Sequence, residues 1–221
     1  RNYGKNGKKY ALDIGLKYDL GKREIFEINT FYAHFTGLFD KPNDIMEWLS
    51  IPIENLSIVT NGKVFEDRLG KFTEIREYIK KGYPKDVRLK KISYHLVMAA
   101  QAGQYNYPRV LGRKDYVTAR LLQSRFIENI LTVVCMLDEK FPPYFKWAYK
   151  ASIENSGLGK VVAKHIENMV LLDQEAYGSK CIILIEEICW LISDYLRANG
   201  MSEQEDNYLL SQANEIILHV H

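Results

Sequence analysis

The stretch GQYNYPRVLGR, residues 103–113, gathers side chains that can bind a ligand between two long segments of helical periodicity. A connection between helices needs only a turn, and a glycine and a proline within the stretch already supply the signals for one. The other side chains offer amides for hydrogen bonding, phenol rings for stacking and guanidinium groups that match phosphate or carboxylate. The stretch is therefore either a polar lid over the core or a loop that faces a ligand. We predict the second, with the substrate-binding residues Gln104, Tyr105, Asn106, Arg109 and Arg113.

A second group with binding chemistry follows a double proline. Lys146 and Trp147 come directly after Tyr144 and Phe145, near the predicted start of a helix. A cation beside an indole can stack on a base or hold a phosphate. The same side chains can also fix the helix to the core, so both interpretations stay open, and Lys146 and Trp147 complete the predicted substrate-binding set.

The titratable residues outside these two groups do not form a recognisable catalytic site. Arg88 and His95 are seven positions apart on a predicted helix, a spacing similar to the Arg and His pair of helical ribonucleases, but a histidine satisfied by packing is the commoner case. Glu24 and Glu27 lie on a predicted strand and point to opposite faces, so they cannot hold one cation together. The sequence has no P-loop, no nucleophile elbow and no zinc-protease helix motif. We predict no catalytic and no metal-binding residue in this chain.

The charge of the chain is unevenly distributed although its net value is only +2. Residues 173–221 carry nine acids against Lys180 and Arg197, a balance of −7, which leaves +9 on residues 1–172. Six cations form a basic stretch at Lys80, Lys81, Lys85, Arg88, Lys90 and Lys91. The stretch can contact phosphates, and a solvated helix face is the plainer interpretation. Nucleic-acid binding through it should be weak, independent of base sequence and sensitive to salt.

The hydrophobic pattern predicts a mainly α-helical bundle preceded by a short β-hairpin. Residues 9–20 and 23–28 alternate in character around Gly21, which indicates two strands and a turn. Short helices follow, the first starting on Asn29 and ending at Gly37. Longer helices are predicted at 72–81, 85–102, 114–140, 143–154, 158–171, 173–199 and 203–219.

Two details of this helical pattern are specific enough to test. The helix at 114–140 carries an apolar stripe, which we expect in the core, at Val117, Leu121, Phe126, Ile130, Val134 and Leu137. Ser202 and Glu205 have the spacing of a capping box, so we predict that the last helix opens there.

Cysteine usage and hydropathy indicate the compartment. Cys135, Cys181 and Cys189 lie inside apolar helical patterns, and an odd, widely spaced set fits neither a disulfide framework nor a zinc site. We expect buried thiols in a reducing cytoplasm. No apolar run approaches the roughly 20 residues that a membrane span needs, so we expect no contact with a bilayer.

Six strings stand in an order that resembles a known family: FYAHFTG, EWLSIP, TNGKVFED, YPKDVRLKKI, GQYNYPR and FPPYFKW. The family is the bacterial domain of unknown function 4037, whose members are similar to nucleotidyltransferases, and the resemblance covers about residues 25–221. It implies an upstream polymerase-beta-like domain whose carboxylates bind Mg²⁺ and a nucleotide, joined to this helical region. Residues 1–30 would then be terminal strands of the α/β nucleotidyltransferase-like domain and residues 31–221 the helical domain. The glycine-serine turn and paired carboxylates of that domain are missing here, so we expect a fragment.

Two functions of different class follow from these observations. In the first, the chain is the acceptor-binding portion of a magnesium-dependent nucleotidyltransferase, inactive alone, with a concave surface lined by residues 104–113 and 146–147. In the second, it is a helical module that binds a partner protein or RNA through a convex basic face at residues 80–91. The apolar segment 181–196 is in addition a candidate seam for a homodimer.

Overall fold

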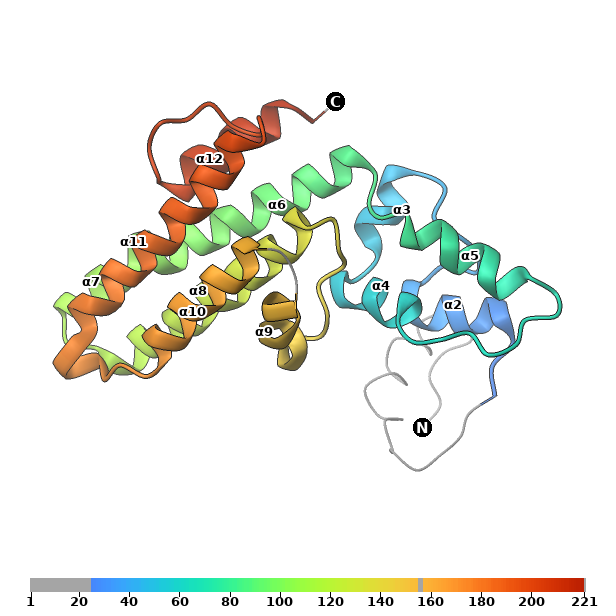
Figure 1. Cartoon of the computed structure of the whole chain (residues 1–221), viewed down its shortest axis with the longest axis horizontal. Helices are drawn as coiled ribbons and strands as arrows, with labels where there is room; N and C mark the ends of the chain where they lie inside the picture. Colours follow the sequence, from blue (N-terminus) through green and yellow to red (C-terminus); the bar gives the residue numbers. More distant parts are fainter. Residues whose placement is uncertain (1–24, 155–156, 221) are drawn as a thin grey trace, which may run out of the picture. The chain divides into compact units, whose positions relative to one another are not determined.

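The computed structural model describes residues 25–154 and 157–220, and helices make up most of this part of the chain (Figure 1). The helices fall into two compact units that divide between Tyr83 and Pro84. Within the described ranges no segment forms a strand, so the chain is mainly α-helical as predicted. None of the helices found there has the length and apolar character that a membrane span requires.

The predicted β-hairpin falls largely outside the described residues, and the structure does not extend its second strand over residues 25–28. Residues 25–27 have no regular structure, and the first described helix begins at Ile28. That helix ends at Gly37, as predicted, because Gly37 adopts a left-handed conformation and donates its N–H to Ala33 O at 3.0 Å. It does not start on Asn29, which lies one residue inside it. The predicted domain boundary at residue 30 stays a prediction.

Four short helices make up the described part of the first unit. They are α2 (Ile28–Thr36), α3 (Ile45–Ser50), α4 (Ile53–Thr60) and α5 (Lys71–Lys80). Helix α4 packs against both α2 and α5. Their core contains Tyr32, Leu56, Ile75 and Ile79, all essentially inaccessible to solvent. The buried Arg76 donates to Asn61 O at 2.8 Å and to Gly62 O at 2.6 Å, which fixes the turn that follows α4.

The second unit contains the longer elements. They are α6 (Lys85–Ala99), η1 (Ala100–Asn106), α7 (Tyr107–Gly112), α8 (Tyr116–Leu137), α9 (Phe145–Glu154), α10 (Gly157–Val170), α11 (Gln174–Ala198) and α12 (Leu209–Leu218). Helices α6 and α8 lie side by side, α12 packs against α6, and α10 packs against α11 (Figure 1). Cys135, Cys181 and Cys189 are all buried, as predicted.

Residues 103–112 are helical, so the predicted loop is wrong. A π-helical segment, η1, continues α6 without interruption and leads into α7. Gly103 does not take the left-handed conformation that would end a helix. A Cβ atom on Gly103 would lie 2.4 Å from Phe126 Cδ2, so the glycine is needed for close packing against α8 and not for a turn. Pro108 fits this helical path because it lies in the first turn of α7.

The apolar stripe predicted on α8 is correct for its C-terminal part and wrong for its start. Phe126, Ile130 and Val134 are buried, as is Leu137, whereas Val117 is 75% and Leu121 61% exposed. The buried face of the first turns passes instead through Ala119 and Gln123. Because Gln123 is polar, a pattern of apolar residues cannot mark this face. Its amide is satisfied inside the bundle by a hydrogen bond to Met169 O at 3.2 Å.

The last helix begins at Leu209 and not at the predicted capping box. Glu215, inside α12, accepts hydrogen bonds from Ser202 Oγ at 2.8 Å, Glu203 N at 2.9 Å and Gln204 N at 3.0 Å. These bonds lower the pKa of the Glu215 carboxyl. Residues 202–204 are therefore held as a loop against the side of α12, because their polar groups are satisfied from a distant position in the sequence.

Candidate functional site

A hollow of about 540 Å³ opens in the second unit where the ends of several helices meet. Its walls include Lys85 and Arg88 from the start of α6, Asp138 and Glu139 from the end of α8, and Tyr195 and Asn199 from the end of α11. We call it the polar hollow. Its lining comes from distant parts of the sequence and is rich in charged and hydrogen-bonding groups, which are able to bind a polar small molecule.

Helices α8 and α11 end at the polar hollow because each is followed there by a residue in the left-handed backbone conformation. Glu139 has a φ of +58° and ends α8, and Lys140 N then donates to Cys135 O at 3.0 Å. Gly200 has a φ of +63° and ends α11, with Met201 N donating to Leu196 O at 2.9 Å. Both arrangements are the Schellman type of helix end. They place the side chains of the last turns of α8 and α11 around the same space.

An ion pair crosses the polar hollow from α6 to α8. Arg88 Nη1 is bonded to Glu139 Oε1, and the side chains of Arg88 and Glu139 are 23% and 74% exposed. Lys85 lies one helical turn before Arg88 and is exposed to solvent. Helix α6 therefore contributes two cations to the hollow, Lys85 and Arg88. Arg88 is paired with Glu139, whose side chain is exposed to solvent.

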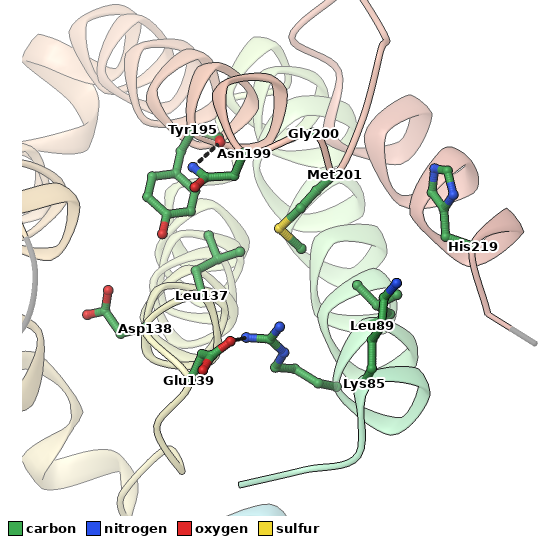
Figure 2. A pocket seen from close by; sticks show the side chains of 11 residues that line it. Lys85, Leu89, Leu137, Asp138, Glu139, Tyr195, Asn199, Gly200, Met201 and His219 are labelled. Atoms are coloured by element: carbon green, nitrogen blue, oxygen red, sulfur yellow. Dashed lines mark hydrogen bonds and ion pairs between the residues drawn. The ribbon is translucent and has the colours of Figure 1, made fainter.

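The wall formed by α11 offers neutral hydrogen-bonding groups. Asn199 Nδ2 donates to Tyr195 O at 2.8 Å, which fixes its amide and leaves the Oδ1 atom available. Figure 2 shows the Tyr195 hydroxyl pointing away from α11 and into the hollow. No described residue is hydrogen-bonded to that hydroxyl. His219, from the end of α12, lies at the edge of the hollow, apart from the other labelled residues (Figure 2).

Residues 48–148 match the model of a family described as Domain of unknown function (DUF4037). The match confirms the resemblance that the sequence strings indicated. Comparison with curated proteins gave no match, and comparison with solved structures gave none either. The DUF4037 segment contributes Lys85, Arg88, Asp138 and Glu139 to the polar hollow, while Tyr195 and Asn199 come from the chain after it.

The predicted substrate-binding residues of the DUF4037 segment do not line the polar hollow. Gln104, in η1, donates to Glu186 Oε2 at 2.9 Å and to Asn207 O at 3.0 Å, and it accepts a hydrogen bond from Leu209 N at 2.9 Å. All the polar atoms of its side chain are thus engaged in joining η1 to α11 and to the start of α12. This geometry gives Gln104 a structural role.

Tyr105 and Arg109 form an exposed stack on the surface. The guanidinium carbon of Arg109 lies 3.6 Å from the centre of the Tyr105 ring, and Tyr105 is 41% exposed. Asn106 donates to Gln101 O at 2.8 Å within η1, and Arg113 is exposed just after α7. These residues therefore stay near one another on one surface, where their role in binding remains a prediction.

Lys146 and Trp147 lie at the start of α9 and do not fix it to the core. Trp147 is 53% exposed, and Lys146 Nζ lies 5.4 Å from the centre of the Trp147 ring. Tyr144 and Phe145, next to them, are also exposed, with ring centroids 4.5 Å apart. The group is thus a surface cluster of aromatic rings with a cation. Neither Lys146 nor Trp147 lines the polar hollow.

The basic stretch is divided between the two units. Lys80 and Lys81 belong to the first unit and the other four cations to the second. Lys80 pairs with Glu77 at 3.0 Å. Lys91 is half-buried, and burial lowers the pKa of its ammonium group. Lys85 and Lys90 remain as the exposed cations of α6.

Arg88 and His95 are not brought together in one site. His95 Nδ1 lies 2.8 Å from Asn129 Oδ1, whereas Arg88 reaches Glu139 at the far end of α8. Burial lowers the pKa of His95, which favours its neutral form. The ribonuclease-like interpretation of this pair is not supported.

A second, shallower hollow of about 420 Å³ lies along α11. It is lined by Ile182, Ile183, Glu186, Glu187, Trp190 and Asn207. Ile183 and Trp190 are 57% and 49% exposed. Apart from Asn207, the residues of this apolar groove lie within 181–196, the segment that the sequence indicated as a candidate dimer seam.

Sequence reasoning missed Tyr195, Asn199, Asp138 and Glu139. Each lies in the last turn of a helix or just after it, where sequence gives no sign of which other helix ends nearby. The feature of the sequence that could have indicated the polar hollow was the pair of cations, Lys85 and Arg88, within the basic stretch.

Proposed function

We propose that this chain is the helical, acceptor-binding portion of a magnesium-dependent nucleotidyltransferase of the cytoplasm, and that the polar hollow holds the acceptor. The observation that carries the proposal is the convergence of Lys85, Arg88, Tyr195 and Asn199 on one hollow. The match of residues 48–148 to the DUF4037 family supports it, because the resemblance to that family implies a nucleotidyltransferase-like catalytic domain upstream.

The contribution of this chain would be to position the acceptor. Transfer of a nucleotidyl group requires an acceptor hydroxyl aligned with the α-phosphate, and holding two reactants in the right geometry contributes a large part of a rate enhancement. Lys85 and Arg88 supply charge-assisted donors, and Tyr195 and Asn199 supply hydrogen bonds for acceptor hydroxyls.

Magnesium and nucleotide are assigned to the upstream domain and not to this chain. Within the described ranges no three residues among His, Cys, Asp and Glu are grouped so that they could hold a metal ion. When bound, Mg²⁺ would neutralise phosphate charge in the catalytic domain, and no step in this chain depends on it.

The apolar groove favours a second candidate function, a helical module that binds a partner protein. Exposed apolar rings are typical of interfaces, and Trp190 is about half exposed there. The other form of this candidate, RNA binding through a basic face, has less support. The basic stretch is divided between two units, and Arg88 and Lys80 in it are paired with acids.

Nucleotide transfer by the chain joined to its catalytic domain tests the proposal. The assay follows label from α-³²P nucleoside triphosphates to a fraction of small polar metabolites in the presence of Mg²⁺, with the 221-residue chain alone as a blank. Lys85→Ala should lower kcat/KM by about 10- to 100-fold, the effect of one lost charge-assisted hydrogen bond. Tyr195→Phe should lower it by about 3- to 10-fold, because a single neutral hydrogen bond is lost.

The matched control is Lys90→Ala, since Lys90 is an exposed cation of the same helix that does not line the hollow. It should transfer label at the wild-type rate. Equal activity of the Lys85→Ala, Tyr195→Phe and Lys90→Ala proteins would remove the hollow as the acceptor site. Label transfer by the chain alone would contradict the assignment of catalysis to the upstream domain.

A further inference from the structure

Glu139 has an unusual backbone conformation for a glutamate. Its φ of +58° lies in the left-handed region, which a glycine adopts at less cost and which is uncommon for other residues. The helix end therefore does not explain why a long acidic side chain stands at this position. The carboxylate is bonded to Arg88 across the polar hollow, and its side chain is otherwise 74% exposed.

The Arg88–Glu139 ion pair is of a kind that exchanges readily. Ion pairs with a solvent-exposed partner contribute little net stability, because water and dissolved ions compete for both groups. Lys85, on the same wall and one turn away, makes no ion pair with a described residue. An anion that entered the hollow would meet both cations, whereas Glu139 satisfies only Arg88.

We propose that the ligand of the polar hollow carries a carboxylate or phosphate group, and that the Glu139 carboxylate occupies the binding position of this group beside Arg88 while no ligand is bound. The ligand anion binds Arg88 and Lys85 and displaces Glu139 into solvent. Hydroxyl groups next to the anion then reach Tyr195 and Asn199 on the α11 wall. The inference depends on the proposed function only in naming this ligand as the acceptor.

Binding of simple anions to the 221-residue chain tests this inference directly. Inorganic phosphate and malonate are titrated separately by calorimetry at constant ionic strength, so that the phosphate and carboxylate sources are distinguished. Glu139→Gln should bind the preferred anion about 2- to 5-fold more tightly than wild type, because a competing exposed ion pair has been removed. Glu139→Gly should do the same, since glycine keeps the left-handed helix end without a carboxylate.

Substitutions of the cations should have the opposite effect. Arg88→Ala and Lys85→Ala should each weaken anion binding by about 10-fold or more. Lys85→Ala keeps the ion pair intact, so it remains informative if Arg88→Ala fails to fold. Glu128→Gln is the matched control, because Glu128 is an exposed acid of α8 that does not line the hollow, and it should bind as wild type.

Two results would overturn the inference. One is anion binding that Glu139→Gln and Glu139→Gly leave unchanged or weaken, and the other is binding of both anions by Lys85→Ala at wild-type affinity. The outcome is separable from that of the transfer assay. Anion binding with the expected order of variants, without nucleotide transfer by the longer protein, would support this inference and remove only the proposed function.

Discussion

Gly103 of η1 lies directly against the ring of Phe126 in α8. A Cβ atom at Gly103 would approach Phe126 Cδ2 to 2.4 Å and Phe126 Cε2 to 2.9 Å, so only glycine fits without a shift of the ring. Both residues are buried, and η1 packs against α8 along this contact. The contact explains how η1 can run close to α8, and it makes the position sensitive to a single added methyl group.

Gly103→Ala should therefore destabilise the protein by about 1 to 3 kcal/mol, the cost of overpacking a well-filled core. Chemical denaturation followed by circular dichroism measures the change in the free energy of unfolding. Gly112→Ala is the matched control, because Gly112 is also helical and no atom lies within 4 Å of its added Cβ. That variant should be neutral or stabilising by up to about 1 kcal/mol. Equal effects of the two substitutions would show that the Phe126 contact does not limit this position.

Gln104→Ala should lower the free energy of unfolding by about 1 to 3 kcal/mol, because it leaves Leu209 N and Asn207 O without their partner. Hydrogen exchange should speed up at the start of α12, where Leu209 loses its hydrogen bond. Gln101→Ala serves as the control, since Gln101 is an exposed glutamine of the same π-helical segment. A Gln104→Ala protein with wild-type stability and reduced substrate use would instead restore Gln104 as a binding residue.

Arg76→Ala should destabilise the first unit by about 2 kcal/mol, since the buried guanidinium donates to Asn61 O and Gly62 O. Amide exchange at residues 59–63 should become faster than in the wild-type protein. Arg68→Ala is the comparison, because the side chain of Arg68 is 85% exposed and its pair with Glu66 contributes at most about 1 kcal/mol. Unchanged exchange after Arg76→Ala would mean that the turn is held by other contacts.

His95 should make the stability of the protein fall at mildly acidic pH. Burial and the charge of Lys91 lower the pKa of His95 below its ordinary value of 6.5, although the hydrogen bond that His95 donates to Asn129 Oδ1 and the charge of Glu128 oppose this shift. The unfolded chain then binds a proton more readily than the folded one, so stability decreases as the pH falls through 6.5 towards the lowered pKa. His95→Gln, which keeps a donor for Asn129, should show a smaller loss of melting temperature between about pH 7.5 and 5.5. His219→Gln, at an exposed position, should follow the wild-type curve.

Local interactions in the sequence determined most of the helical architecture. The predicted segments at 72–81, 158–171 and 173–199 correspond closely to α5, α10 and α11, because apolar periodicity and helix ends depend on residues a few positions apart. The burial of the three cysteines and the match of residues 48–148 to the DUF4037 family model also follow from the sequence alone.

Tertiary structure decided the path of residues 103–113 and the composition of the polar hollow. A glycine in a sequence is equally compatible with a turn and with close packing against a neighbouring side chain. Only the position of Phe126 shows that Gly103 serves close packing. Tyr195 and Asn199 meet Lys85 and Arg88 because α6 starts where α8 and α11 end. That convergence results from the packing of whole helices against one another, and no pattern within a few residues of any of these side chains encodes it.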